Sequence, residues 1–189
     1  QAELVAVPAA DTSCHLLPEG ITPEQAVLLT DILPTGYYGA RNADIRPGDT
    51  VAVIGLGYVG LPLALLFAES GFRIIGFDVD PKKIDALRAG NSYVKHIGVD
   101  RVRAVFKDSG QRATTDFDLL TECDAIIICV PTPLGPHRDP DLKYIRITAE
   151  EVGKRIRKGQ LIVLESTTYP GTTREELLPR LSAGSLKCG

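Results

Sequence analysis

A short β-branched run followed at once by three spaced glycines constrains this chain more than any other feature. Residues 51–54 read Val-Ala-Val-Ile, typical of a buried strand, and the next six read Gly-Leu-Gly-Tyr-Val-Gly. In such a G-x-G-x-x-G pattern the first glycine permits a tight turn, the second admits a phosphate close to the backbone, and the third lets a helix pack closely on the sheet. These roles fall on Gly55, Gly57 and Gly60.

An acidic residue lies where the same pattern predicts one. A second apolar run, residues 73–77, ends at Asp78, roughly 20 residues after the glycines. A carboxylate there can accept hydrogen bonds from an adenosine ribose diol and repel a 2′-phosphate. The intervening helix, expected near 59–70, would point its unpaired N–H groups at an anion. The sequence therefore predicts a dinucleotide site that prefers NAD to NADP, with a structural glycine turn and an ordinary strand-end carboxylate as the alternatives.

The rest of the chain after residue 48 indicates an α/β fold. Short apolar runs alternate with helical patterns, as in βαβ units with a parallel sheet. Right-handed crossovers give the strand order 3-2-1-4-5, a Rossmann-type doubly wound sheet with its site at the switch point between strands 1 and 4. We expect strands near 51–55, 73–78, 112–115, 124–129 and 160–164, and helices near 59–70, 81–89, 98–107, 141–157 and 172–181, the third being the least regular.

Residues 1–48 have a different sequence pattern, and we predict that they form a strand–helix appendage to a Rossmann domain of residues 49–189. Residues 3–7 alternate like a strand. Residues 22–25, Thr-Pro-Glu-Gln, form a capping box that opens a helix interrupted by Pro34. The apolar stripe of this helix has to be covered, so we expect residues 22–40 to be helical and docked on the Rossmann core of the same or a neighbouring chain; the stripe comprises Leu28, Leu29, Ile32 and Leu33.

Charge and composition exclude several classes of function. The 189 residues carry 21 basic and 24 acidic side chains without a basic block, which gives nucleic-acid binding little support. No apolar run approaches about 18 residues and no leader pattern opens the chain, so neither a membrane partner nor export is expected and the cytoplasm is the expected location. The four cysteines lack metal or redox spacing and are expected as reduced thiols, with Cys123 and Cys129 packing beside a strand. The chain has no methionine, even at position 1, which suggests a fragment.

From about residue 50 to residue 189 the chain resembles the NAD-binding half of the UDP-sugar 6-dehydrogenases, most closely the UDP-N-acetylglucosamine 6-dehydrogenase branch. Four motifs in order carry the resemblance: Gly-Leu-Gly-Tyr-Val-Gly-Leu-Pro at 55–62, Asn-Ser-Tyr-Val-Lys-His-Ile at 91–97, Cys-Val-Pro-Thr-Pro at 129–133 and Glu-Ser-Thr-Thr-Tyr-Pro-Gly-Thr at 165–172. Residues 1–50 instead resemble zinc-type medium-chain alcohol dehydrogenases of the formaldehyde-dehydrogenase branch, through residues 1–3, 31–36 and 46–49. The chain is therefore interpreted as a chimera, with a natural single protein as the alternative.

The first resemblance implies an NAD site and assigns roles to individual residues. Thr167, after strand 5, is implied to border the nicotinamide and to help place a catalytic water, as an auxiliary catalytic residue; a turn-capping hydroxyl is the alternative. Glu165 and His96 are weaker candidates, and His137 is expected in solvent. The implied cofactor contacts are Gly55, Gly57, Tyr58, Val59 and Gly60 on the phosphates, Asp78 on the ribose, Lys83 on the adenosine side with Lys82 as its alternative, and Thr132 and Thr167 beyond strands 4 and 5.

The chemistry implied by the resemblance is oxidation of a primary alcohol to a carboxylate with two NAD, through a thioester on a cysteine. The family's nucleophilic cysteine and its oxyanion-stabilising lysine have no counterpart here, and Cys188 is outside the cysteine motif. We therefore expect an NAD-binding domain that is catalytically incomplete as it stands and that does not by itself oxidise UDP-N-acetylglucosamine.

No metal is predicted, although the second resemblance touches a zinc site. Asp31 matches a zinc ligand of that family, but the matching cysteine and histidine partners are missing, and Cys14-His15 has no ligand spacing. The alternative to an NAD-binding domain is a non-catalytic scaffold, with a homo-oligomer as one form and cofactor binding incidental.

Overall fold

A computed structural model of the protein describes residues 16–29, 45–46, 48–135 and 140–182, together with isolated positions before residue 16. The chain divides into two compact units, residues 1–44 and 45–189. Apart from Ala6, the strand predicted at residues 3–7 lies outside the described residues, as does the predicted helical continuation through residues 30–40.

In the first unit, the capping box predicted from the sequence is present at the start of α2 (Pro23–Leu29). The Thr22 N–H donates to Gln25 Oε1 at 3.0 Å, and the Gln25 N–H donates to Thr22 Oγ1 at 3.3 Å. Two N–H groups that the helix itself cannot pair are thereby satisfied. The docking of residues 22–40 stays a prediction.

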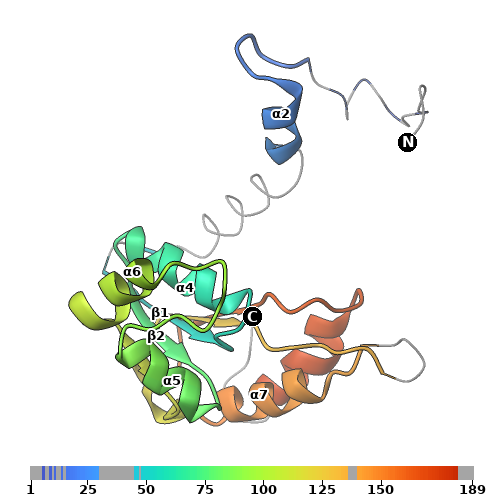
Figure 1. The fold of residues 1–189 in the computed structure, drawn as a ribbon. Helices are drawn as coiled ribbons and strands as arrows, with labels where there is room; N and C mark the ends of the chain where they lie inside the picture. The colour runs from blue at the N-terminus through green and yellow to red at the C-terminus, as the bar shows by residue number, and fades with distance from the viewer. Residues whose placement is uncertain are drawn as a thin grey trace. The chain divides into compact units, whose positions relative to one another are not determined.

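The second unit is built on a five-stranded sheet in which all neighbouring strands are parallel (Figure 1). The strand order is β3-β2-β1-β4-β5, so the predicted Rossmann-type α/β fold is confirmed. In register, Val53 at the centre of the sheet faces Gly76 on one side and Ile127 on the other. The strands are β1 (Thr50–Ile54), β2 (Arg73–Phe77), β3 (Arg112–Thr114), β4 (Ala125–Ile128) and β5 (Leu161–Leu164).

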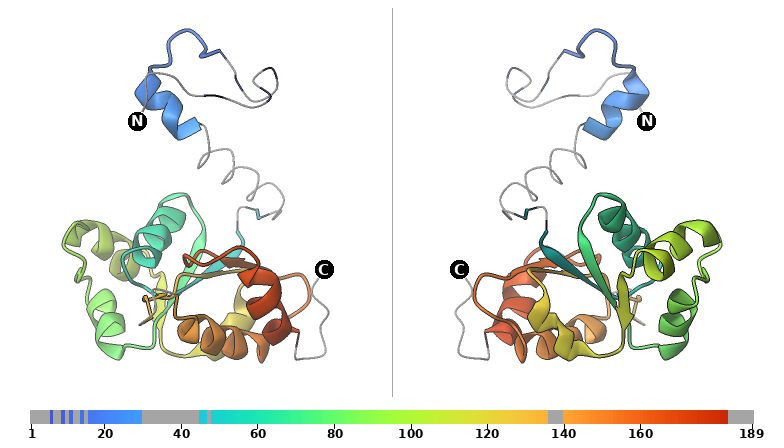
Figure 2. Two further views of the ribbon diagram at one scale, coloured as in Figure 1. Left: turned by 90° about the vertical axis from the view of Figure 1, so that its right-hand side faces the viewer. Right: turned by 90° about the vertical axis from the view of Figure 1, so that its left-hand side faces the viewer.

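Helices cover both faces of the sheet, as Figure 2 shows with green elements on one side and orange to red elements on the other. The first face is covered by α4 (Gly60–Glu69), α5 (Pro81–Arg88), α6 (Val99–Val102) and the π-helix η1 (Arg103–Asp108). The second is covered by the 3₁₀ helix η2 (Phe117–Glu122), α7 (Lys143–Gly153), the π-helix η3 (Thr173–Leu177) and α8 (Leu178–Leu181).

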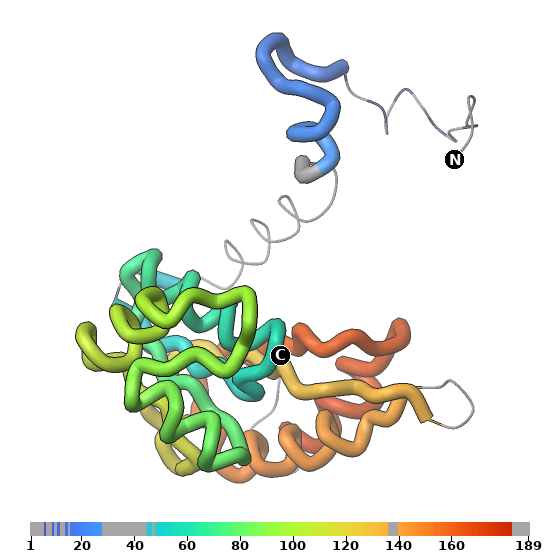
Figure 3. The backbone as a smooth tube through the Cα atoms, viewed as in Figure 1, coloured from blue at the N-terminus to red at the C-terminus, as the bar shows by residue number. Residues whose placement is uncertain are grey.

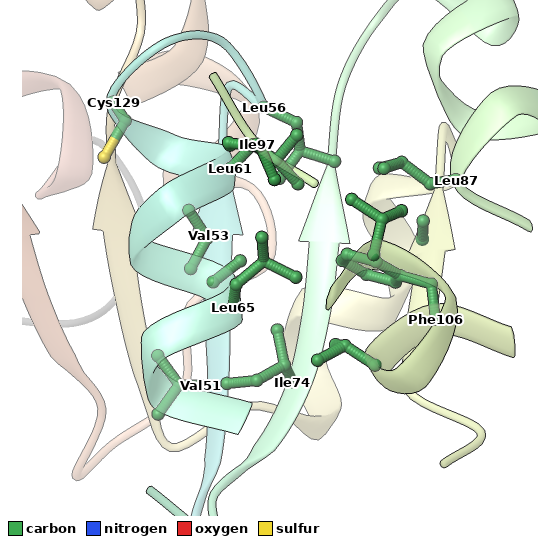
Figure 4. Close-up of a cluster of buried hydrophobic side chains, with 14 of the residues drawn as sticks. Val51, Val53, Leu56, Leu61, Leu65, Ile74, Leu87, Ile97, Phe106 and Cys129 are labelled. Carbon is green, nitrogen blue, oxygen red and sulfur yellow. The ribbon is translucent and has the colours of Figure 1, made fainter. Parts of the chain in front are cut away.

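Alternation along the strands divides the core between these two faces, because successive side chains of a strand point to opposite sides. Val51 and Val53 pack under α4 with Leu61 and Leu65, as Figure 4 shows. Ala52 and Ile54 instead belong to the cluster that contains Ile145 and Val152 of α7.

Two predicted helices change their hydrogen-bond pattern instead of running as regular α-helices. The helix expected at 98–107, which the sequence predicted to be the least regular, is α-helical over Val99–Val102 and π-helical over Arg103–Asp108. At its end the Ser109 hydroxyl donates to the Val105 carbonyl at 2.7 Å, and the Ser109 N–H donates one residue further back, to the Ala104 carbonyl at 3.0 Å. The helix expected at 172–181 is a π-helix up to Leu177. Pro179 has no N–H to donate, and the regular α-helix begins beside it.

The other differences concern one helix end and one short helix. The helix expected at 141–157 ends at Gly153. Beyond this point the Arg155 guanidinium donates a hydrogen bond to the Glu151 carbonyl at 3.0 Å, and the Arg155 N–H donates to the Val152 carbonyl, not to that of Glu151. The 3₁₀ helix Phe117–Glu122 is absent from the prediction; it starts at an Asp116 cap on the Asp118 N–H. Within the described part of the chain, no helix is both long enough and apolar enough to cross a membrane.

Candidate functional site

A cleft of about 440 Å³ lies at the carboxyl ends of the strands and reaches from the end of β1 to the residues that follow β4 and β5. It contains the point between β1 and β4 at which a doubly wound sheet reverses direction. The connection that follows β4 runs outward from this edge before the chain returns to α7, and its two described limbs pair at Leu134 and Pro140 (Figure 3).

The three glycines after β1 each meet a different steric requirement. Gly55 has a φ of +90°, and a methyl group added there would lie 2.6 Å from the Cys129 carbonyl oxygen. A methyl group on Gly60 would overlap the Gly55 carbonyl oxygen, because α4 begins directly against the turn. Gly57 has nothing within 4 Å of such a methyl group, and the residue lines the cleft.

The backbone N–H groups of residues 57–60 form the most distinctive part of the cleft. Among the described residues none of these four groups has an acceptor, and the first bonded N–H is that of Leu61, which donates to the Gly57 carbonyl at 3.1 Å. They stand at the N-terminus of α4, the positive end of its dipole. Free donors at such a position suit a phosphate or diphosphate.

Asp78 follows β2 and is held at the side of the cleft. It is 5% exposed, and it accepts hydrogen bonds from the Leu56 N–H at 2.9 Å and the Asp80 N–H at 3.0 Å. Lys83 reaches it with an Nζ–Oδ2 distance of 2.8 Å and also lines the cleft, whereas the exposed Lys82 gives only its backbone N–H, to Asp80. Of the two lysines left open by the sequence, Lys83 is therefore the one placed at the cleft.

The far side of the cleft is formed by the residues after β4 and β5. Thr132, Glu165 and Thr167 all line it. The intervening Ser166 hydroxyl donates to the Val130 carbonyl at 2.8 Å, which ties the end of β5 to the end of β4. Residues from the two separate segments that follow β4 and β5 are thus brought to one surface.

The cleft also contains an apolar surface that was not predicted from the sequence. Val79, Phe117, Tyr144 and Ile147 line it, and Val79 and Ile147 remain 81% and 49% exposed. A flat aromatic ring could pack against these exposed apolar side chains, which line the same cleft as Asp78. The signal was available in α7, where Tyr144 and Ile147 share one helix face with spacing i, i+3.

Two other groups of predicted residues lie outside the cleft or outside the described residues. The His96 ring is exposed and stacks on Tyr58, with 6.0 Å between ring centroids, and it does not line the cleft. No group of three or more potential metal ligands occurs in the described ranges. His15, Asp31, His137 and Cys188 lie outside the described residues.

The buried cysteines behave as packing residues, as predicted. Cys123 and Cys129 are free and buried on either side of β4. Burial raises the pKa of each thiol to about 12, with the Glu165 charge adding to the effect at Cys129. Both thiols are therefore protonated at neutral pH, which disfavours the thiolate form of Cys129 although the residue lines the cleft.

Comparison with known proteins gives consistent matches over the second unit. Residues 49–187 match the NAD binding domain of the UDP-glucose/GDP-mannose dehydrogenase family. The chain is 41% identical to a UDP-N-acetyl-D-mannosamine dehydrogenase of Campylobacter jejuni over 127 residues, and 39% identical to a UDP-N-acetyl-D-glucosamine 6-dehydrogenase of Pseudomonas aeruginosa over 133 residues. These matches cover 66% and 69% of this chain and 30% of each relative, so the chain spans about a third of their length.

Solved structures agree with the sequence matches. The fold is similar to that of a UDP-glucose dehydrogenase from Pyrobaculum islandicum, with a TM-score of 0.69 and 33% identity over 74% of this chain and 34% of that one. A GDP-mannose dehydrogenase from Pseudomonas aeruginosa gives a TM-score of 0.68 and 32% identity over 72% of this chain and 33% of that one.

Proposed function

Because the chain belongs to the UDP-glucose/GDP-mannose dehydrogenase family and carries its NAD binding domain, we propose that the cleft binds NAD in one defined orientation. The observation that carries the proposal is the four N–H groups at residues 57–60, which have no acceptor in the part of the chain that the structure describes and lie near the buried Asp78 carboxylate. The pyrophosphate is assigned to these N–H groups, with Gly55 and Gly60 shaping the turn and Tyr58 and Val59 at its rim. The open space at Gly57 fits such a ligand, since a side chain there would fill it.

The remaining parts of the dinucleotide are assigned by chemistry. Asp78 and Lys83 take the adenosine ribose, and the apolar surface at Val79 and Ile147 takes the adenine ring. Thr132 and Thr167 lie on the nicotinamide side. Bound NAD supplies a hydride acceptor, and the Thr167 hydroxyl serves as an auxiliary group that orients a water molecule there.

For the whole protein we propose oxidation of a UDP-N-acetylhexosamine. The support is the identity of 36–41% to curated relatives named as dehydrogenases of UDP-N-acetyl-D-mannosamine and UDP-N-acetyl-D-glucosamine. The catalytic contribution of this domain is to bind the cofactor and orient it. We do not assign a nucleophilic role to Cys123 or Cys129, because both thiols are buried and protonated.

Calorimetric titration with NAD and with NADP tests the cofactor assignment. We expect wild-type protein to bind NAD at least about tenfold more tightly, because a 2′-phosphate would meet the Asp78 carboxylate and a like-charge contact costs several kcal/mol. Asp78→Asn should narrow that preference by about tenfold, because it removes the charge and keeps one acceptor oxygen. Asp78→Ala is also expected to narrow the preference for NAD, but this substitution leaves the Leu56 and Asp80 N–H groups without their acceptor.

Asp80→Asn is the matched control for this titration. Its carboxylate caps α5 by accepting from the Lys82 N–H and is absent from the cleft surface, and asparagine is an equally good N-cap. The control should keep the wild-type preference. Equal affinity of wild-type protein for both cofactors would show that Asp78 does not distinguish the 2′-hydroxyl of NAD from the 2′-phosphate of NADP.

Four finer interpretations remain proposals, namely the medium-chain-dehydrogenase-like character of residues 1–48, the chimeric origin, the homo-oligomer and the cytoplasmic location. The family match covers residues 49–187 and does not test the first of these. The same titration tests the alternative scaffold function, because we expect a scaffold in which cofactor binding is incidental to bind NAD weakly or not at all.

A further inference from the structure

The segment between α5 and α6 packs against residues 55–60, which connect β1 to α4 and which we call the phosphate loop, and is itself anchored in the core. Val94 and Ile97 are buried in the apolar cluster that also holds Leu56 and Leu61. Figure 4 shows Ile97 beside Leu56 and Leu61. The Ile97 N–H donates to the Val94 carbonyl at 3.0 Å, which closes a turn within the segment. The segment is therefore a fixed support next to the loop.

Tyr93 connects this support to the loop through its hydroxyl group. The Tyr93 hydroxyl donates to the Leu56 carbonyl with an oxygen–oxygen distance of 2.6 Å, and the ring is half-buried. Burial, reinforced by the negative charges of Asp78 and Asp80, raises the pKa of the Tyr93 phenol well above its ordinary value. The phenol therefore keeps its proton at neutral pH and can donate to the Leu56 carbonyl.

The Leu56 carbonyl belongs to the same peptide unit as the Gly57 N–H. A trans peptide is planar, so its C=O and N–H point in opposite directions. With the carbonyl held by Tyr93, the Gly57 N–H is directed away from Tyr93. It has no acceptor among the described residues, and Gly57 lines the cleft.

This peptide needs such a restraint because its C-terminal neighbour is glycine. Glycine occupies most backbone conformations at little steric cost, so the Leu56–Gly57 peptide could rotate and turn its carbonyl toward a bound anion. The Leu56 side chain is fully buried and the Leu56 N–H is held by Asp78, which fixes the preceding peptide only.

We propose that Tyr93 is a positioning residue for the phosphate loop: its hydroxyl holds the Leu56 carbonyl so that the Gly57 N–H is presented to the cofactor pyrophosphate. The inference rests on the proposed NAD function and adds a specific donor to it. It predicts that Tyr93 matters for the diphosphate part of the ligand and not for the nucleoside part.

The test compares Tyr93→Phe with wild-type full-length chain, using NAD, ADP and adenosine as ligands. The variant keeps the ring and loses one hydrogen bond to the loop. We expect affinity for NAD and for ADP to fall about fivefold, the factor that corresponds to one ordinary hydrogen bond, and adenosine affinity to stay unchanged. Tyr169→Phe is the matched control, since the Tyr169 hydroxyl has no hydrogen-bond partner among the described residues and does not line the cleft. It should leave all three affinities at their wild-type values.

An NMR titration of wild-type protein provides a second readout that does not depend on the variant's fold. The Gly57 amide proton resonance should shift on addition of inorganic pyrophosphate and stay in place on addition of adenosine. Unchanged NAD affinity in folded Tyr93→Phe, an equal loss for adenosine and ADP, or a Gly57 resonance indifferent to pyrophosphate would each overturn the inference. Absence of NAD binding in the wild type would instead refute the proposed function itself, and this inference with it.

Discussion

Gly57→Val is expected to abolish NAD binding while leaving the fold intact. The backbone at Gly57 lies outside the left-handed region, and a Cβ there meets nothing within 4 Å, so the folded chain can accept the side chain. The two branches would occupy the space assigned to the pyrophosphate. Loss of two charge-assisted hydrogen bonds, about 1.5–3 kcal/mol each, corresponds to at least about a 100-fold weaker affinity. Calorimetric titration measures the affinity, and circular dichroism with thermal unfolding checks the fold.

Gly57→Ala is the graded companion of this variant. A single methyl group fills less of the same space, so its NAD affinity should lie between those of wild type and Gly57→Val. If Gly57→Val folds and keeps wild-type NAD affinity, the pyrophosphate does not bind at this loop.

Gly60→Ala is expected to have the opposite profile, with a large loss of stability. The added methyl group would overlap the Gly55 carbonyl oxygen and lie 3.2 Å from the Cys129 Cβ, and the backbone oxygen cannot rotate away as a flexible side chain could. Separating the start of α4 from the β1 turn should lower the free energy of unfolding by about 3 kcal/mol. Urea denaturation followed by circular dichroism measures the change.

Gly98→Ala is the control for this stability loss. Gly98 is the N-cap of α6 with a φ of −63°, and a methyl group there meets nothing within 4 Å. Its effect should stay below about 1 kcal/mol. Wild-type stability in Gly60→Ala would mean that α4 does not start against the Gly55 turn.

The fold, and the position of the main candidate residues at the cleft, could be predicted because each follows from a local pattern. The strand order follows from alternating short apolar runs and right-handed crossovers, and the turn after β1 follows from the spacing of its three glycines, of which Gly55 and Gly60 leave no room for a side chain. Asp78 and Lys83 could be predicted because they lie on one continuous strand–turn–helix segment, so their proximity needs no knowledge of distant contacts.

The features that could not be predicted depend on side chains that compete for backbone groups or on distant contacts. An irregular helix near 98–107 was expected, but its π-helical pattern at 103–108 was not, because it involves the hydrogen bonds that the Ser109 hydroxyl and N–H make to two different carbonyls. The end of α7 depends in the same way on the Arg155 guanidinium. The apolar surface of the cleft combines Val79, which follows β2, with Ile147 on α7. Tyr93 is the clearest example, because the atom that it holds lies 37 residues earlier in the chain.

A crystal structure of the chain soaked with NAD tests the central claim most directly. The account predicts the pyrophosphate within hydrogen-bond distance of the N–H groups of residues 57–60 and the adenosine ribose on Asp78. It also predicts the adenine ring against Val79 and Ile147, and the nicotinamide toward Thr132 and Thr167. A dinucleotide bound with its pyrophosphate away from residues 57–60, or in the reverse orientation with the nicotinamide at Asp78, would contradict it.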